Sequence, residues 1–190
     1  LPILVSLPIG IGHAHSSVAV WGLPTPVEPF LRDLLLTLEG VFADIVSTHR
    51  TVIHANVAAN LGEVAEKAPD KMRKKTMERV DAGNAIASAD YIRALGRAEA
   101  QAQALDRLFD HYDALLAPSA TGQAPVGIGF TGNHVFNGMW TLLGVPSVSE
   151  PLLKGADGMP IGVQVIGRRG EDAKALKTAR WLWDRFEDKG

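Results

Sequence analysis

The chain contains no cysteine among its 190 residues. A disulfide framework, a thiolate metal site and a cysteine nucleophile are therefore excluded, so any catalysis must use oxygen or nitrogen groups. A chain without thiols is compatible with a reducing compartment, and we expect a cytoplasmic protein. With 46% hydrophobic residues, the chain is also long enough to form one domain around its own core.

The sequence has no marked excess of either charge, because its formal net charge is −2. A surface that binds nucleic acid normally carries a basic excess on one face. The basic cluster of Lys71, Arg73, Lys74 and Lys75 has no aromatic residues between its members to stack on bases, which is typical of a solvated helix face. We expect no nucleic-acid partner.

Long hydrophobic runs are missing too, since none reaches the roughly 18 residues that a membrane span requires. The apolar segment 1–12 lacks the basic residues of a signal peptide and is interrupted by Pro2 and Pro8. We expect no membrane association. Because the chain begins with Leu1 rather than Met, we also expect that a preceding segment was removed or left out.

The local motifs of serine catalysis are absent: there is no Gly-x-Ser-x-Gly elbow, no Ser-x-x-Lys and no Gly-Ser-Ser-Gly run. No catalytic residue is therefore assigned. Ser119, Ser147 and Ser149 fall at the ends of expected strands, where a hydroxyl group can line a pocket but more often bonds a turn or the backbone.

Cofactor motifs are equally weak. Gly127–Gly132 matches Gly-x-Gly-x-x-Gly, but Pro125 stands where a dinucleotide site needs a strand. The histidine pairs His13 and His15, and His49 and His54, fit no standard zinc spacing. We expect neither a cofactor nor a metal.

The first half of the chain predicts helices after an irregular start. Residues 1–29 are rich in proline and glycine, and we expect one short strand there, at Ile3–Leu7 or Val18–Trp21. Apolar spacing predicts helices from residue 30 to 45, from 52 to 67 and from 70 to 82, the last ending at Gly83 in a left-handed cap. A further helix is expected from Ser88, a good N-cap, to residue 111.

The second half alternates strands and helices. Short apolar runs predict buried strands at 114–117, 146–153 and 161–166. A last helix is expected over residues 171–189, with Leu176, Ala179, Trp183 and Phe186 buried. The pattern indicates an α/β fold, a mixed β-sheet with flanking helices. Residues 1–29 form an unassigned segment, and residues 30–190 form the domain.

Several motifs occur in a fixed order in the second half. They are Tyr112-Asp-Ala-Leu-Leu-Ala-Pro118, Thr131-Gly132 followed by Phe136-Asn137, Leu143-Gly-Val-Pro146 and Pro160-Ile-Gly-Val-Gln164. In this order they resemble the C-terminal half of the amidase signature family. The resemblance implies that residues 30–190 form part of the amidase signature fold.

That family hydrolyses linear amides with a Lys–Ser–Ser triad on a Gly/Ser-rich segment, which lies in the half preceding the one seen here. The resemblance implies part of an amidase, inactive as this chain alone, whose complete enzyme takes a small-molecule amide and uses no cofactor. It also implies that the loop after Ala117 and the segment 131–140 form one wall of the acyl pocket. The substrate-binding candidates are Ser119, Thr121, Thr131, Phe136 and Trp140.

The alternative is a non-catalytic binding or scaffold domain derived from an amidase, with the loop 119–132 as its site. In either case the strands need more cover than the expected helices supply. We therefore expect an exposed apolar face, and with it a homo-oligomer or association through that face.

Overall fold

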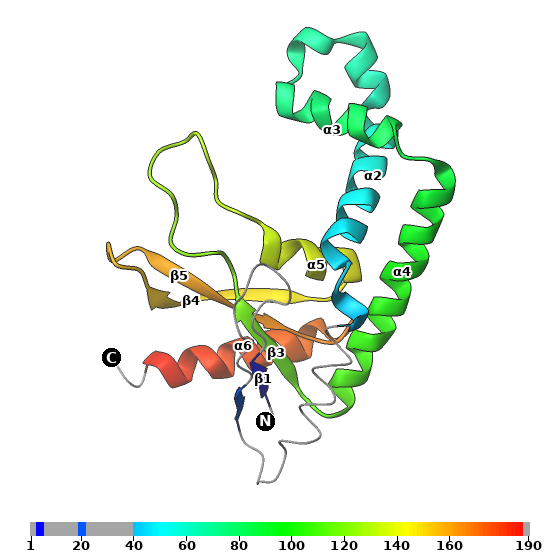
Figure 1. The fold of residues 1–190 in the computed structure, drawn as a ribbon. Helices are drawn as coiled ribbons and strands as arrows, with labels where there is room; N and C mark the ends of the chain where they lie inside the picture. The colour runs from blue at the N-terminus through cyan, green and yellow to red at the C-terminus, as the bar shows by residue number, and fades with distance from the viewer. Residues whose placement is uncertain (1–2, 6–18, 22–39, 188–190) are drawn as a thin grey trace. The chain divides into compact units, whose positions relative to one another are not determined.

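The computed structural model describes residues 3–5, 19–21 and 40–187. The chain divides into two compact units, one made of Leu1–Ala43 with Ala102–Gly190 and the other of Asp44–Gln101. Each unit is described by itself, and Figure 1 shows the order of their elements.

The first unit contains a mixed five-stranded sheet in the order β2-β1-β3-β5-β4. The strands are β1 (Ile3–Val5), β2 (Ala19–Trp21), β3 (Ala114–Pro118), β4 (Ser147–Lys154) and β5 (Pro160–Ile166). β1 runs parallel to β3, and the other neighbours are antiparallel. The predicted α/β class with a mixed sheet is confirmed. Both segments considered for a single N-terminal strand form strands, and they pair with each other.

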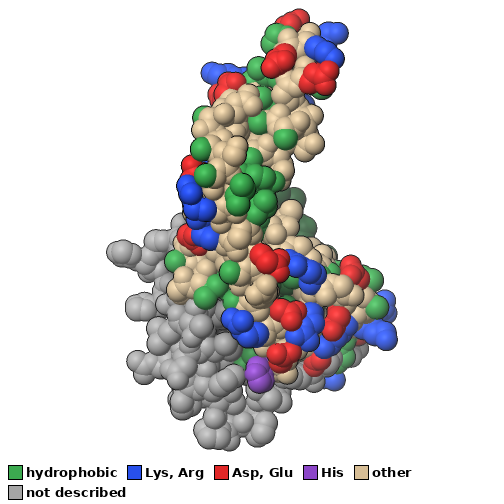
Figure 2. Space-filling view, turned by 90° about the vertical axis from the view of Figure 1, so that its right-hand side faces the viewer, with side chains coloured by type: hydrophobic (Ala, Val, Ile, Leu, Met, Phe, Trp, Pro, Cys, Tyr) green, Lys and Arg blue, Asp and Glu red, His purple; other side chains and the backbone are tan. Residues whose placement is uncertain are grey.

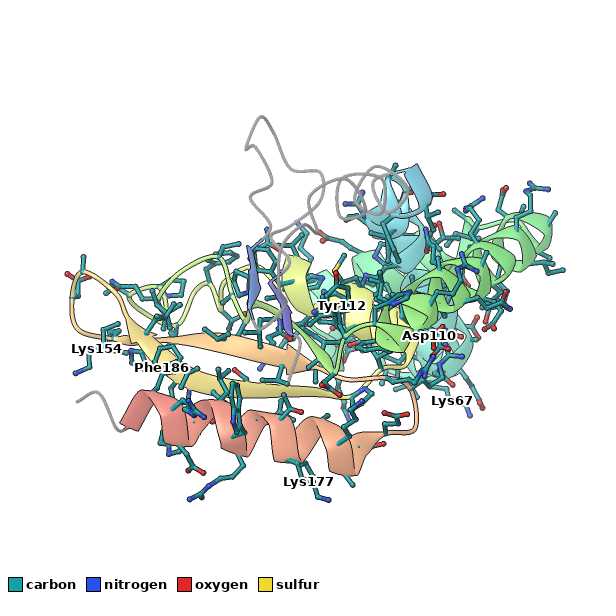
Figure 3. The ribbon with its side chains drawn as sticks, turned by 90° about the horizontal axis from the view of Figure 1, so that it is seen from below. Lys67, Asp110, Tyr112, Lys154, Lys177 and Phe186 are labelled. Atoms are coloured by element: carbon teal, nitrogen blue, oxygen red, sulfur yellow. The ribbon has the colours of Figure 1, made fainter. Side chains whose placement is uncertain are left out.

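Helix α6 (Asp172–Glu187) packs on one face of this sheet, where Ala179 and Leu182 meet Ala114 and Val165. Figure 3 shows α6 running along β4 and β5, with Lys177 pointing away from the sheet. The predicted buried face of this helix was partly wrong. Leu176 is 58% exposed, whereas Leu182 is only 7% exposed.

The reason is the close approach of α6 to the sheet end. A Cβ atom added to Gly167 would lie 2.8 Å from the Cβ of Ala175. Only a small side chain fits at that contact, so the face that carries Ala175, Ala179 and Leu182 turns inward. Leu176 lies one position further round and faces solvent.

Helix α5 (Val135–Leu143) ends at Gly144, whose φ of 65° places it in the left-handed region that glycine tolerates. The N–H of Val145 then donates to the carbonyl of Trp140 at 3.2 Å. The Arg169 guanidinium donates to the carbonyl of Leu143 at 2.6 Å through Nη2. These bonds satisfy carbonyl groups that a helix end would otherwise leave open.

The second unit is helical. It contains α2 (Ile45–Lys67), the short 3-10 helix η1 (Pro69–Lys71), α3 (Lys74–Asn84) and most of α4 (Ser88–Asp106). Gly83 does not form the predicted left-handed cap, because it lies inside α3 and is buried against α2. The helix expected over residues 30–45 falls largely outside the described residues, which show helix at 40–42 and a turn at 43–44.

Among the described helices, none combines the length and the apolar character needed to cross a membrane.

The 3-10 helix η2 (Arg107–Asp110) follows α4 and leads into β3. Arg168 joins this turn to the end of β5, since its Nε and Nη2 each donate to the Asp106 carboxylate at 2.9 Å. The same guanidinium reaches Asp110 at 2.6 Å.

Candidate functional site

The two faces of the sheet differ in chemistry. Leu116, Val165 and Val148 are neighbours across β3, β5 and β4, and all three belong to the core that packs against α6. Successive residues of a strand point to opposite faces. The residues one position further along, Ala117, Gln164 and Ser149, therefore belong to the opposite face.

On that opposite face, the hydroxyl groups of Ser119 and Ser149 share a hydrogen bond of 2.7 Å, in which either oxygen can be the donor. Ser119 follows β3 directly, and its N–H donates to the carbonyl of Gly162 at 2.9 Å. A Cβ atom at Gly162 would lie 2.7 Å from each of the two hydroxyl oxygens. Glycine at this position is therefore what lets the two serines meet.

Gln164 continues this polar strip. Its Nε2 donates to the carbonyl of Pro118 at 2.8 Å, and its Oε1 accepts a 2.7 Å hydrogen bond from the Ser147 hydroxyl. Gln164 is buried, and the protein itself uses both ends of its amide. We define the polar strip as Ser119, Ser147, Ser149, Gly162 and Gln164.

The chemistry of the strip is that of hydroxyl groups without a base. Within the described residues, Ser119 and Ser149 hydrogen-bond each other, and no lysine or histidine is hydrogen-bonded to either hydroxyl. Activation of a serine nucleophile requires such a base. As it stands, the strip can donate and accept hydrogen bonds, with Ser149 exposed and Gln164 fixed behind it.

The α6 side of the sheet contains a cavity of about 440 Å³. Its walls come from the strand ends, the loop after β3 and α6: Leu116, Ala117, Pro118, Ala120, Thr121, Gly122, Leu152, Leu153, Ile161, Gly162, Val163, Leu182 and Phe186. In Figure 3, Phe186 lies at the C-terminal end of α6, near the end of β4 that carries Lys154. This volume falls in the range of small-molecule sites, and the lining is almost wholly apolar.

The loop from residue 119 to 134 begins between the polar strip and the cavity. Gln123 ties it to the β4–β5 turn, because its Nε2 donates to the Asp157 carboxylate and its Oε1 accepts from the Asp157 N–H at 3.4 Å. Beyond this tie, Val126, Ile128 and Phe130 are exposed. Figure 1 shows this stretch as a long excursion between β3 and α5.

Two buried polar groups lie near the ends of elements in the same unit. Trp140 on α5 and Tyr112 before β3 are both buried, and within the described part of the chain neither the Trp140 Nε1–H nor the Tyr112 hydroxyl has a hydrogen-bond partner. Burial raises the pKa of Tyr112 above its ordinary value.

The structure distributes the five candidate residues over different places. Ser119 is in the polar strip and Thr121 lines the cavity. Thr131 is exposed in the loop, while Phe136 is half-buried and Trp140 is buried on α5. No group of three or more metal-ligating side chains occurs among the residues that the structure describes.

Sequence analysis missed the role of Gly162 and the contribution of Leu182 and Phe186 to the cavity. The signal for Gly162 was its place between Ile161 and Val163 in a strand, since a glycine there often marks a close approach of another group. The two α6 residues gave no comparable signal, because their contact with the strand ends depends on how the helix docks.

The match to a family model extends over residues 24–176 and is to the family described as Amidase. The chain belongs to the amidase family. AmiA2 of Mycobacterium tuberculosis strain H37Rv, which bears a provisional amidase name, is 29% identical over 143 residues, or 67% of this chain and 29% of that protein. A glutamyl-tRNA(Gln) amidotransferase subunit of Cereibacter sphaeroides strain ATCC 17025 is 32% identical over 124 residues, or 57% of this chain and 25% of that protein.

Among solved structures, one described as an amidase matches this amidase-family chain with a TM-score of 0.68 and 29% identity. The match covers 78% of this chain and 36% of that one. The chain thus spans about a third or less of the length of these relatives. The resemblance found in the motifs between Tyr112 and Gln164 is confirmed by these matches.

Proposed function

We propose that the chain supplies part of an amidase that hydrolyses linear amide bonds through a serine nucleophile, and that it has no amidase activity alone. The observation that carries this proposal is the amidase match over residues 24–176 in a sequence that contains no Gly-Ser-Ser-Gly run. The triad of the family would then come from the portion of its relatives that this chain does not match. Removing a triad abolishes most of an enzyme's rate enhancement.

In this proposal the chain contributes to the binding of the acyl group. The apolar cavity supports the role, because its volume suits a small apolar group and Thr121 offers a hydroxyl at its wall. Ser119 contributes a hydroxyl to the neighbouring polar strip. Thr131, Phe136 and Trp140 complete the proposed wall of the acyl pocket. The complete enzyme would act on a small-molecule amide in the cytoplasm.

A second candidate function is that of a non-catalytic binding domain. The observation that favours it is the apolar cavity of about 440 Å³, which a ligand could occupy without any catalytic group. The two functions predict different results when a Lys–Ser–Ser triad is supplied by another polypeptide, since only a chain that is part of an amidase should then support turnover.

The test is a complementation experiment on the purified chain. Alone, it should not hydrolyse an aryl amide above the blank rate, and a serine-directed phosphonate should not label it. If the chain is part of an amidase, co-expressing it with the Lys–Ser–Ser-containing portion of a related amidase should restore turnover. The phosphonate should then abolish that turnover. Cavity binding without any restored turnover would favour the binding domain, whereas phosphonate-sensitive turnover by the chain alone would overturn the proposal.

We further propose that the chain associates, with a second copy or with another portion of an amidase, through the exposed apolar residues of its loop. Val126 and Ile128 are fully exposed, and Phe130 is 59% exposed. Glycines separate them, so the three side chains follow one another at every second position. Apolar groups that gather on a surface in this way commonly mark an interaction site.

A further inference from the structure

The cavity on the α6 side of the sheet has walls with almost no polar chemistry. Among the described residues that line it, Thr121 alone has a polar side chain and none is charged. Charged residues make up 21% of the chain. Figure 2 shows acidic and basic side chains interspersed over the face that it presents. The uncharged lining is therefore a feature of this place rather than of the chain as a whole.

Two consecutive leucines of β4 contribute to the cavity wall from the same face of the sheet. Leu152 packs against the core that α6 covers. Leu153 pairs with Ile161 of β5, and paired residues share a face. Ile161 lies four residues before Val165, a member of that core, so Ile161 and Leu153 face α6 as well. In a regular strand, two successive side chains would point to opposite faces.

A β-bulge accounts for the two leucines. Between Glu150 and Leu153, β4 advances by three residues while β5 advances by two, from Val163 to Ile161. The extra residue bends the strand and re-aims a side chain. The backbone of β4 thus turns a second large apolar side chain toward the cavity.

The loop after β3 supplies another wall, and hydrogen bonds hold it in place. Residues 120–122 line the cavity. The next residue, Gln123, bonds the Asp157 carboxylate through Nε2 and the Asp157 N–H through Oε1. Its amide also lies against Gly155, where an added Cβ atom would collide with it. A wall that is already ordered lowers the cost of ordering the site when a ligand binds.

The size of the cavity suits a ligand larger than one ring. A cavity of roughly 150 Å³ with apolar walls is enough to bind benzene. This cavity measures about 440 Å³, so a single ring would leave most of it unfilled. Leu153 and Phe186 line it and are still 48% and 47% exposed. A larger ligand would cover this apolar surface, which favours binding.

We propose that this cavity binds an uncharged hydrocarbon acyl group larger than one ring. Its role in a substrate rests on the proposed amidase function, whereas its binding rests on the cavity alone. A charged acyl group would lose its hydration and gain no counter-charge from the described walls, which costs more than apolar contacts return. The Thr121 hydroxyl is the polar side chain that these walls offer to the amide.

Binding to the purified full chain tests this class of ligand without any turnover. Naphthamide is titrated by its own fluorescence, and benzamide competes with it, as does a naphthamide that carries a carboxylate on its second ring. Naphthamide should bind at least about tenfold more tightly than benzamide, because the second ring buries more apolar area. The carboxylate should weaken binding at least about tenfold. Equal affinities for the one-ring and two-ring amides, or for the charged and uncharged ones, would overturn the proposal.

Two substitutions in one loop locate the bound naphthamide. Ala120→Phe places a ring in the cavity wall and should weaken naphthamide binding at least about tenfold, with a smaller effect on benzamide, which needs less room. Ala124→Phe is the matched control, since it adds the same ring at an exposed position that does not line the cavity. It should leave the affinity unchanged. Equal weakening by both substitutions would place the ligand elsewhere and overturn the proposal.

Leu153→Ala keeps the test decisive if circular dichroism shows that Ala120→Phe does not fold. It truncates a wall residue that is 48% exposed, and it should weaken naphthamide binding about fivefold. Leu176→Ala makes the same change on α6 outside the cavity and should have no effect. Equal affinities in the parent and Leu153→Ala would count against the proposal.

The complementation experiment separates this inference from the amidase function. Restored turnover in a chain that does not bind naphthamide would overturn the hydrocarbon site and leave the amidase function standing. Naphthamide binding without restored turnover would overturn the amidase function and leave the hydrocarbon site standing.

Discussion

The hydroxyl oxygens of Ser119 and Ser149 lie 2.7 Å apart, joined across β5 at the position of Gly162. Ser119 follows β3 and Ser149 lies in β4, and β5 lies between these two strands. The hydrogen bond therefore spans β5 on the polar face of the sheet. The contact depends on the lack of a side chain at residue 162. This dependence makes Gly162 the residue at which the polar strip is best tested.

Gly162→Ala should destabilise the chain by about 1 to 3 kcal/mol, the usual cost of forcing an extra methyl group into a packed site. The new Cβ would stand 2.7 Å from both hydroxyl oxygens, so at least one serine must move. Urea unfolding measures the change. Gly129→Ala is the control, since a Cβ there meets nothing within 4 Å, and an equal loss of stability in both variants would contradict the account.

Leu182→Ala and Leu176→Ala test which face of α6 is buried. Truncating the buried Leu182 should cost about 2 to 5 kcal/mol. Truncating Leu176, which is 58% exposed, should change stability by no more than about 0.5 kcal/mol. The urea midpoints of the two variants compare the same chemical change at two positions of one helix. A larger loss of stability in Leu176→Ala than in Leu182→Ala would show that the face expected from the sequence is the buried one.

The sequence located the elements better than it located their contacts. Strands 114–117, 146–153 and 161–166 were found within a residue or so, because short apolar runs bounded by proline and glycine carry a local signal. The buried face of α6 was misjudged because the spacing of Leu176 and Phe186 is as helical as that of Ala175 and Leu182. Helix periodicity does not reveal that Gly167 lets the small residues approach the sheet.

The polar strip was beyond sequence analysis for a similar reason. Ser119 and Ser149 were noted separately as strand-end hydroxyls, but their meeting depends on the register of three strands and on Gly162. Gly83 was recognised as special, yet its role is close packing within a helix rather than a left-handed cap. Whether Gly83 serves as a left-handed cap or as a site of close packing depends on its contact with α2, which the local sequence does not reveal.

Gly83→Ala should separate α2 from α3 and destabilise the helical unit, by about 3 kcal/mol, at the upper end of the range for overpacking. The atom it would strike is the His54 backbone oxygen, at 2.1 Å, which cannot turn aside as a flexible side chain can. Gly62→Ala in α2 is the matched control. Its Cβ meets nothing within 4 Å, so it should instead stabilise the helix by about 0.5 to 1 kcal/mol. Thermal unfolding followed by circular dichroism should show opposite shifts, and shifts of the same sign would refute the packing argument.

Arg168→Gln should change the acid dependence of stability. The hydrogen bond from Arg168 is the main cause that lowers the pKa of Asp106 below its ordinary value of 3.8. A carboxyl group whose pKa is lower in the folded state contributes stability that is complete above pH 3.8 and is lost as the pH falls through the folded pKa. The urea midpoint of the parent should therefore exceed that of the variant at neutral pH, and the gap should narrow in acid.

The control for that experiment is Arg180→Gln, which removes an exposed pair with Asp184 on α6. Exposed pairs of this kind contribute little, so the acid profile should match that of the parent. The difference in urea midpoint between the parent and Arg168→Gln could instead stay constant through the acid range. That result would show that Arg168 acts by packing rather than through the Asp106 carboxylate.

The association proposed for the loop predicts a mass that depends on concentration. Val126, Ile128 and Phe130 are exposed on a segment whose intervening glycines offer no side chains to shield them. In sedimentation velocity over the micromolar range, the parent chain should form dimers or larger species. Replacing all three residues by serine should leave a monomer, because the apolar area that drives association is gone. Leu176→Ser removes an apolar group that is also exposed but lies on α6, and it should not alter the mass. A parent chain that stays monomeric at every concentration would show that this loop does not drive self-association, and the complementation experiment would then decide whether it binds another portion of an amidase.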